Sequence, residues 1–511
     1  MSDGREENLP RLWWYQAGVK LRVPVPALRR TRALLVAASL AMACESSTPA
    51  ADGPEAEAEA EELVEPLPSG LAARVSAYLE QWGRHWPTFR FHGAVLVARG
   101  DQIAVDQAYG MADLISGVPN ETTTVFRLGT LSAQLTAAAT LRLVEAGTLR
   151  LDDPVARFLP GWPGGESITI EHLLSYRSGL PSYTEDLAFE RWKRAPRSLD
   201  EALDQFRGHP LEFEPGRDTA PSNSNTVLLG AVLQAATGEP YEQVIARTVL
   251  EPLGMSHTRF ATTDEPQARG MVFDEAEILE VVDDVHPTAF GPAGGWLSTT
   301  GDLLRWVRGL GDERFLSARH VMQMQGRLGE GMGYSWVVDE ASGREVVTWP
   351  GLIDGFNGSL LHVPQDDTTI IVLSNSEVVP AGQLVQDIAT LVYEDELVRR
   401  EEPRAVPTEL AELRPVVGRY ALTRGTEEAL AEADPEAVAK LGEIEVLEQD
   451  GQLVLDVPSH GRKRMHPLGD GGFFFKDLAQ TRARVTLRGE RPNLLVLEAG
   501  GTELRFIGIE G

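Results

Sequence analysis

Two segments rich in alanine and leucine limit the folds that this chain can adopt. The first runs from about Leu131 to Gly147, and the second runs from Val227 to Ala236 and is followed by Gly238. Apolar residues lie on all sides of the first segment, which is typical of a helix buried within a domain. Glycine at the end of each segment is a common helix terminator. The sequence therefore predicts that the first segment is a helix buried within a domain and that the second is another alanine- and leucine-rich helix.

Composition is typical of a globular protein with room for two or three domains. The chain has 511 residues, of which 42% are hydrophobic and 24% charged, so it can bury a sizeable core. Its net charge of −29 argues against nucleic-acid binding, because phosphates are held by clustered Lys and Arg side chains. Solubility is the simplest role of such an acidic surface.

The N-terminal region contains the only cysteine, Cys44, so an intrachain disulfide is excluded. Basic residues precede an apolar run from Ala33 to Ala43, which is too short to span a bilayer as a mature helix. Residues 1–44 resemble a bacterial lipoprotein leader, although the usual leucine three residues before the cysteine is Ala41 here. Lipidation of Cys44 would attach the chain to a membrane.

An ordinary signal peptide or a short signal anchor is the alternative interpretation of this leader, and Cys44 would then have no role. Both interpretations predict export to the cell envelope. Glu45 replaces the aspartate that often retains lipoproteins in an inner membrane, which favours the outer membrane or periplasm. Residues 45–70 consist largely of Ala, Glu and Pro without a basic residue, so we expect a disordered linker.

Residues 71–400 contain a series of blocks in an order known from one protein family. An amphipathic segment and a hairpin-like segment come first, and six blocks follow at 109–113, 173–183, 214–230, 251–260, 291–306 and 351–358. This order resembles the serine β-lactamase-related hydrolases, which include class C β-lactamases and penicillin-binding proteins. The resemblance implies a β-lactamase/transpeptidase-like domain, with an antiparallel sheet flanked by helices and a helical subdomain.

Residues 408–511 have a different pattern of short alternating segments. The turn Asp450-Gly451 joins two of them, which predicts antiparallel strands. They resemble the small lipocalin-like β-barrel that some family members carry at the C-terminus, and closure of such a barrel removes exposed sheet edges. The expected fold class is therefore α+β and multidomain.

Acyl transfer requires a nucleophile, a base, a proton relay and N–H groups for the oxyanion. The family begins its central helix with Ser-Xaa-Xaa-Lys, and this motif aligns with residues 130–133. Thr130 keeps a hydroxyl at the helix N-terminus, but its methyl group crowds the approach of a carbonyl. Ala133 removes the amine that would act as base. Ser132 is a weaker candidate nucleophile, because residues two apart on a helix face different directions.

The second family motif, Tyr-Xaa-Asn, aligns with residues 221–223. Pro221 cannot relay a proton, whereas Asn223 keeps an amide that could bind a substrate or satisfy backbone groups of its loop. Shifting the alignment to residues 222–225 supplies hydroxyls and amides but no tyrosine.

The third family motif, Lys-Thr-Gly or His-Xaa-Gly, aligns with residues 349–351. Trp349 replaces the cationic or imidazole group. Gly351 remains, and the backbone N–H groups of Leu352 and Thr130 stand at the oxyanion-hole positions that the resemblance implies. No spacing of His, Cys, Asp and Glu indicates a metal site, and no glycine-rich motif indicates a nucleotide cofactor.

These substitutions predict an exported pseudoenzyme that has lost acyl transfer and binds a cell-wall peptide or another envelope protein. An active esterase or peptidase with an unrecognised nucleophile and base is the first alternative. Binding through the C-terminal barrel is the second. The sequence leaves the ligand and the oligomeric state open.

Overall fold

The structure is a computed structural model that describes residues 66–85, 90–186, 188–261, 268–273, 278–282, 286–327, 332–394, 405–427, 441–457, 461–468, 472–475, 481–488, 491–499 and 502–509. The predicted leader 1–44, with Cys44, and the predicted linker up to residue 65 lie outside the described residues. Among the helices in the described ranges, none combines the length and the apolar character needed to cross a bilayer.

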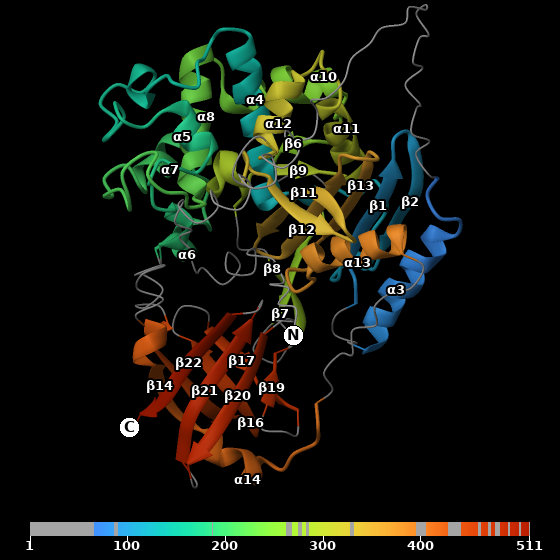
Figure 1. Ribbon diagram of the computed structural model, residues 1–511, viewed down its shortest axis with the longest axis vertical. Helices are drawn as coiled ribbons and strands as arrows, with labels where there is room; N and C mark the ends of the chain where they lie inside the picture. The colour runs from blue at the N-terminus through green and yellow to red at the C-terminus, as the bar shows by residue number, and fades with distance from the viewer. Residues whose placement is uncertain are drawn as a thin grey trace, which may run out of the picture.

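A six-stranded antiparallel sheet forms the centre of the larger domain (Figure 1). Its strands point their side chains alternately into two cores: Leu96 of strand β1 (Gly93–Arg99) packs into one core and Val97 into the other. The order of strands is β10 (Val337–Ala341), β11 (Arg344–Ile353), β12 (Phe356–Val363), β13 (Thr368–Ser374), β1 (Gly93–Arg99) and β2 (Gln102–Tyr109).

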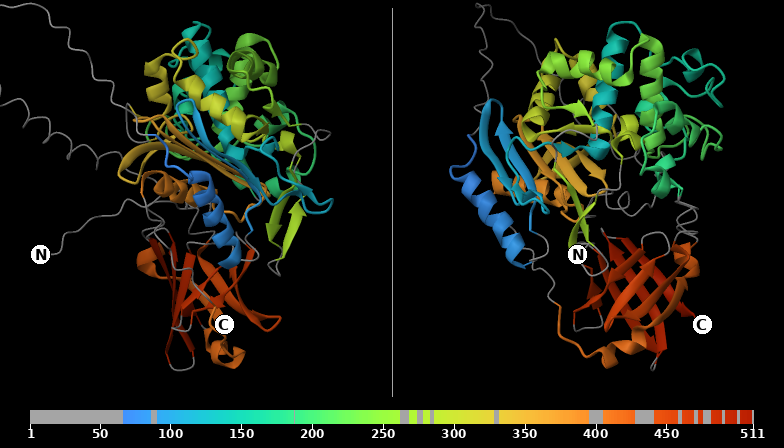
Figure 2. Two further views of the ribbon diagram at one scale, coloured as in Figure 1. Left: turned by 90° about the vertical axis from the view of Figure 1, so that its right-hand side faces the viewer. Right: turned by 180° about the vertical axis from the view of Figure 1, so that it is seen from behind.

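Helices cover both faces of this sheet, as the two turned views in Figure 2 show. Helices α3 (Leu71–His85) and α13 (Ala381–Tyr393) pack on one face. The other core contains α11 (Thr300–Leu310) and the helical subdomain. Shorter helices of that subdomain are α5 (Ile170–Leu174), α6 (Phe189–Trp192), α7 (Leu199–Asp204), α9 (Tyr241–Ile245), α10 (Glu251–Leu253) and α12 (Ala318–Met324).

The two alanine- and leucine-rich segments form α4 (Ser132–Glu145) and α8 (Asn223–Thr237). Residues 132–141 of α4 and 224–233 of α8 are buried without interruption. This confirms the predicted burial of α4 and shows that α8 is enclosed as well. Helix α8 ends at Gly238, whose φ of 71° is the left-handed conformation that glycine adopts without strain.

In the described part of the larger domain, seven short strands lie outside the central sheet. They are β3 (Met111–Asp113) with β4 (Val118–Pro119), β5 (Phe126–Arg127) with β9 (Trp296–Ser298) and β6 (Arg259–Phe260), and β7 (Gly270–Phe273) with β8 (Leu279–Val282). The first pair is a hairpin, and the second group places β9 beside the start of α4.

The C-terminal part folds into a nine-stranded antiparallel sheet that is nearly closed. Its edge strands, β17 (Gly461–Arg464) and β18 (His466–Pro467), are separated only by Met465, so the sheet curls until its two edges are neighbours in sequence. The other strands are β14 (Gly418–Leu422), β15 (Glu443–Gln449), β16 (Gln452–Val457), β19 (Gly472–Phe474), β20 (Thr481–Arg488), β21 (Arg491–Ala499) and β22 (Thr502–Ile509).

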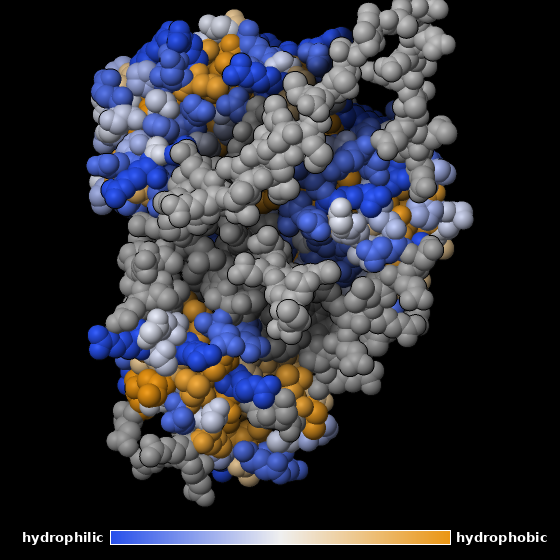
Figure 3. All heavy atoms as spheres, viewed as in Figure 1, coloured by the Kyte–Doolittle hydropathy of each residue, from blue (hydrophilic) through white to orange (hydrophobic). Residues whose placement is uncertain are grey.

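Aromatic side chains fill the inside of this sheet. Tyr420, Phe473, Phe475 and Phe506 are each at most 1% exposed and belong to one apolar cluster. On the face shown in Figure 3, further apolar residues gather over the barrel strands. The barrel-like sheet confirms the predicted fold of this region, and its interior is a packed core.

Candidate functional site

Two glycines allow the turn before α4 to lie directly against strand β11. The turn is a 3₁₀ segment, Gly129–Leu131, and Gly129 has a φ of 52°. A Cβ at Gly129 would lie 2.2 Å from the carbonyl oxygen of Leu352, and one at Gly351 would lie 2.5 Å from that of Leu128. Only glycine permits such close backbone contact, and Thr130 is thereby placed beside the strand.

The Thr130 hydroxyl is hydrogen-bonded to the backbone of β11. It donates to the carbonyl oxygen of Pro350 at 2.8 Å and accepts from the N–H of Leu352 at 3.2 Å. Both partners that the structure describes for this hydroxyl are therefore backbone groups, neither of which can take up its proton. The N–H of Leu352, predicted to bind an oxyanion, points at the hydroxyl itself. Thr130 is 9% exposed.

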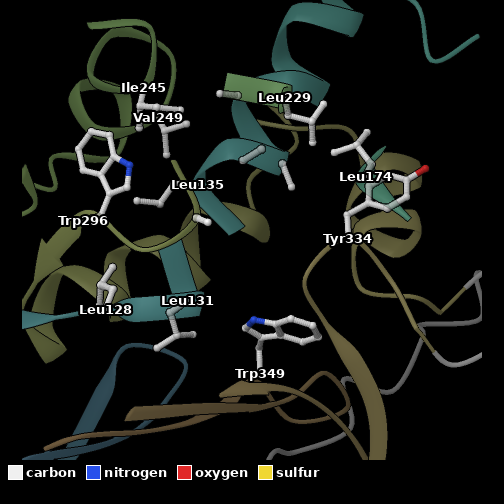
Figure 4. Packing of buried hydrophobic residues seen from close by; sticks show 14 of the residues in the cluster. Leu128, Leu131, Leu135, Leu174, Leu229, Ile245, Val249, Trp296, Tyr334 and Trp349 are labelled. Atoms are coloured by element: carbon white, nitrogen blue, oxygen red, sulfur yellow. The ribbon is translucent and has the colours of Figure 1, made fainter. Parts of the chain in front are cut away.

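Trp349 fills the space beside Thr130. Its side chain is 3% exposed, and its indole N–H donates to the carbonyl oxygen of Thr130 at 3.2 Å. The indole stacks on the ring of Tyr176, with 6.1 Å between centroids and 13° between planes. Figure 4 shows the indole pointing from β11 into the apolar cluster that contains Leu131 and Tyr334. An aromatic pair thus occupies the position where the resemblance predicted a cation or an imidazole.

A satisfied polar network holds Tyr176 in place. Its hydroxyl is 2.6 Å from the hydroxyl of Ser335, and both residues have positive φ angles, 57° and 62°. Gln134 donates to the carbonyl oxygen of Ser335 at 3.1 Å and accepts from the indole N–H of Trp306 at 3.0 Å. Burial raises the pKa of Tyr176, so its hydroxyl stays neutral. Tyr176 and Ser335 are far apart in the chain, so no sequence pattern indicated that their hydroxyls would pair.

Ser132 and Ala133 are both buried in α4. The Ser132 hydroxyl is 0% exposed and accepts from the backbone N–H of Trp296 at 3.4 Å. Ser132 therefore points toward β9, whereas the hydroxyl of Thr130 points toward β11. Ala133 is 5% exposed and carries no polar atom on its side chain.

Pro221 and Asn223 lie at the start of α8. The Asn223 amide donates to the hydroxyl of Thr184 at 2.8 Å, and its backbone N–H donates to the hydroxyl of Ser182 at 3.2 Å. These bonds connect α8 to the preceding loop, which is the structural role that the sequence left open for Asn223. The hydroxyl of Ser222 is buried and has no hydrogen-bond partner among the residues that the structure describes.

A buried lysine links the helical subdomain to the central sheet. The Lys193 side chain is 7% exposed and pairs with the carboxylate of Asp354 in the turn between β11 and β12. Lys193 follows α6 and is far from Asp354 in the chain, so no sequence pattern indicated this contact. In the described part of the chain, no group of three or more His, Cys, Asp and Glu side chains is arranged to hold a metal ion.

Comparison with known proteins extends these observations. The sequence model of the family described as Beta-lactamase matches residues 75–392. A penicillin-binding protein of Bacillus subtilis (strain 168) is 26% identical over 454 residues, which cover 81% of this chain and 94% of that protein. Esterase EstB of Burkholderia gladioli is 36% identical over 225 residues, covering 41% of this chain and 56% of the esterase.

Solved structures show the same fold. The octameric penicillin-binding protein homologue from Pyrococcus abyssi superposes with a TM-score of 0.58 at 22% identity, covering 85% of this chain and 99% of that one. D-amino acid amidase from Ochrobactrum anthropi SV3, complexed with D-phenylalanine, gives a TM-score of 0.57 at 20% identity, covering 64% and 100%. At these identities the superpositions concern the fold alone.

Proposed function

This chain belongs to the beta-lactamase family, and from that premise we propose that it is a catalytically impaired member that binds a ligand or partner in the cell envelope. Relatives and structural neighbours include penicillin-binding proteins, an esterase and an amidase. These proteins point to acyl-transfer chemistry as the ancestral activity of the site.

The observation that carries the proposal is the bonding of the Thr130 hydroxyl. A hydroxyl becomes a nucleophile when a base removes its proton, and here the Thr130 hydroxyl donates its proton in a hydrogen bond to the carbonyl oxygen of Pro350, which is not a base. The N–H of Leu352 that would stabilise an oxyanion is paired with the same hydroxyl. Ala133 provides no amine. The nucleophile, base and oxyanion requirements are therefore all unmet by the motif residues.

The filled site also affects what can bind. Trp349 and Tyr176 stack on one another beside Thr130, which is itself only 9% exposed, so little of Thr130 is open to an acyl group. A cell-wall peptide or an envelope protein would have to contact the outer surface of the domain. Between these two, a partner protein agrees better with a closed site, because it needs a surface and not a deep cleft.

Reaction with an acylating probe tests the loss of activity. The full chain is incubated with a fluorophosphonate or a labelled penicillin, and the peptide containing residues 127–141 is analysed by mass spectrometry. We expect no adduct at Thr130 or Ser132. Thr130→Ser serves as the matched variant, and it should also remain unlabelled because the base is absent. An adduct on the parent chain that disappears in Thr130→Ala would show that the chain is an active hydrolase.

The leader leads to a separate proposal, that the chain is exported and lipid-anchored through Cys44 at the outer membrane or in the periplasm. The basic stretch, the short apolar run and the small residue before Cys44 support it. Cys44→Ser should abolish incorporation of a labelled fatty acid and move the chain from the membrane fraction to the soluble fraction. Unchanged membrane association of this variant would favour a signal anchor.

A further inference from the structure

The β3–β4 hairpin, residues 111–119, displays a cluster of exposed apolar side chains. Ile115 is 72% exposed, Val118 50%, and Met111 and Leu114 are each 37% exposed. We call these four residues the apolar tip. Ala112 between them faces inward and is 7% exposed. Single exposed apolar residues are common on protein surfaces, but four within eight positions form a patch of the kind that marks a contact site.

The hairpin is held rigidly to the domain, so the apolar tip cannot fold back to bury itself. The backbone N–H of Met111 donates to Nδ1 of His92 at 2.9 Å, and the amide of Asn375 donates to the carbonyl oxygen of Met111 at 3.0 Å. Within the turn, the N–H of Ile115 donates to the carboxylate of Asp113 at 2.8 Å. A contact made by this hairpin would therefore cost little ordering of the chain.

We propose that the apolar tip contacts the surface of a lipid bilayer with uncharged or zwitterionic headgroups. The tip has four exposed apolar residues, and a patch of this kind is often functional on monomers. Two copies meeting through their tips would contribute four residues each, well below the ~20–30 residues a side of a stable interface. A bilayer surrounds a protruding tip and needs no complementary surface, so a small apolar patch suffices to contact it.

Charge determines which lipids fit. The chain carries a net charge of −29, so anionic headgroups would repel it. At the base of the tip, Asp113 lies 3.8 Å from Arg269, and this pair adds no net charge. The predicted anchor is compatible with the same bilayer, because the chain from Cys44 to Pro66 has a contour length of about 75 Å. The proposal itself does not require an acyl chain on Cys44.

A site-specific fluorophore tests the proposal in the full chain. Cys44 is the only cysteine, so Cys44→Ser removes the acylation site and leaves no other thiol to label. Ile115→Cys is then labelled with an environment-sensitive dye. Ile103→Cys is the matched control, because Ile103 is 48% exposed at the far end of β2. Phosphatidylcholine vesicles should raise the emission at position 115 at least about twofold and shift it to the blue, while position 103 stays unchanged.

Two further arms complete the experiment. Phosphatidylglycerol vesicles should give a smaller response at position 115. Adding Val118→Asp should abolish the response to phosphatidylcholine. Thermal unfolding of this variant confirms that it is folded. The proposal is overturned by no response at 115, or by equal responses at 115 and 103. A blue shift at 115 that grows with protein concentration without vesicles would assign the tip to a second copy and also overturn it.

Discussion

Trp349 changes both the charge and the shape of the site. At the third motif it replaces a cation or imidazole, which removes a proton carrier, and its indole also occupies space beside Thr130. Stacking on Tyr176 and a hydrogen bond to backbone fix this ring in one position. The residue is therefore packed and hydrogen-bonded at the position where the alignment predicts a cation or an imidazole.

Replacing this ring tests its packing role. Trp349→Ala should lower the free energy of unfolding by about 3–5 kcal/mol, because a large buried ring is lost and leaves a cavity. Trp349→Phe keeps a stacked ring but loses the N–H that bonds to Thr130, so we expect a loss of about 1–2 kcal/mol. Urea denaturation measures both values. Equal values for the two variants would contradict a packing role.

Opening the volume should not restore catalysis. In Trp349→Ala the Thr130 hydroxyl still lacks a base, since Ala133 is unchanged, and labelling by a penicillin or fluorophosphonate should remain absent. Mass spectrometry of the labelled chain measures this outcome. If Trp349→Ala became labelled at Thr130, steric exclusion of the probe by the Trp349 indole would explain the absence of labelling in the parent chain. The missing amine at Ala133 would then not be the cause.

At the scale of elements, Asn375 after β13 joins segments that are distant in sequence. Its side-chain nitrogen lies 3.0 Å from the carbonyl oxygen of Met111 in β3 and 2.9 Å from that of Arg269 before β7. Its side-chain oxygen Oδ1 accepts from the amide of Asn120 at 3.2 Å. Asn375 is 0% exposed, so these bonds form in the protein interior, where unpaired polar groups are costly.

Removing this side chain should loosen the β3–β4 hairpin. Asn375→Ala leaves buried carbonyl groups without their donor, and we expect a loss of about 2–3 kcal/mol in the free energy of unfolding. Asn357→Ala is the control, because the Asn357 amide makes one long hydrogen bond, 3.3 Å to the carbonyl oxygen of Glu377. Urea denaturation gives both values, and hydrogen exchange at residues 111–113 should increase only in Asn375→Ala. Similar effects of the two substitutions would argue against the proposed link.

At the scale of the whole molecule, a partly buried histidine makes stability depend on pH. Desolvation lowers the pKa of His362 to about 4, from its usual value of about 6.5. The nearby carboxylate of Asp366 acts in the opposite direction, and Arg327 adds to the lowering. Below pH 6.5 the unfolded chain binds a proton at this residue and the folded chain does not. The contribution of neutral His362 to the free energy of unfolding is therefore complete above pH 6.5 and is lost as the pH falls toward 4.

This linkage predicts a pH-dependent difference between variants. Between pH 7.5 and pH 4.5 the parent chain should lose about 2–3 kcal/mol more stability than His362→Gln, which cannot titrate. His209→Gln is the matched control, because His209 is exposed, and it should behave like the parent. Urea denaturation at the two pH values measures the difference. Parallel losses in parent and His362→Gln would refute the assignment.

The family and the enclosure of α4 were predictable from the sequence. The family follows from the order of the blocks, and the burial of α4 follows from alanine and leucine on all sides of that segment. The substitutions at the aligned motif positions stay a prediction, because they rest on the alignment alone. Such properties depend on local composition or on alignment with the family. They need no knowledge of which distant segments meet.

Tertiary structure decided how the altered residues are used. It pairs the Thr130 hydroxyl with Pro350 and Leu352, and it stacks Trp349 on Tyr176. These contacts join residues that are far apart in the chain. Their geometry depends on how the 3₁₀ segment Gly129–Leu131, strand β11 and the helical subdomain pack together. Sequence patterns record periodicity within a segment, whereas the direction of a hydroxyl in a packed site is set by neighbours from other segments.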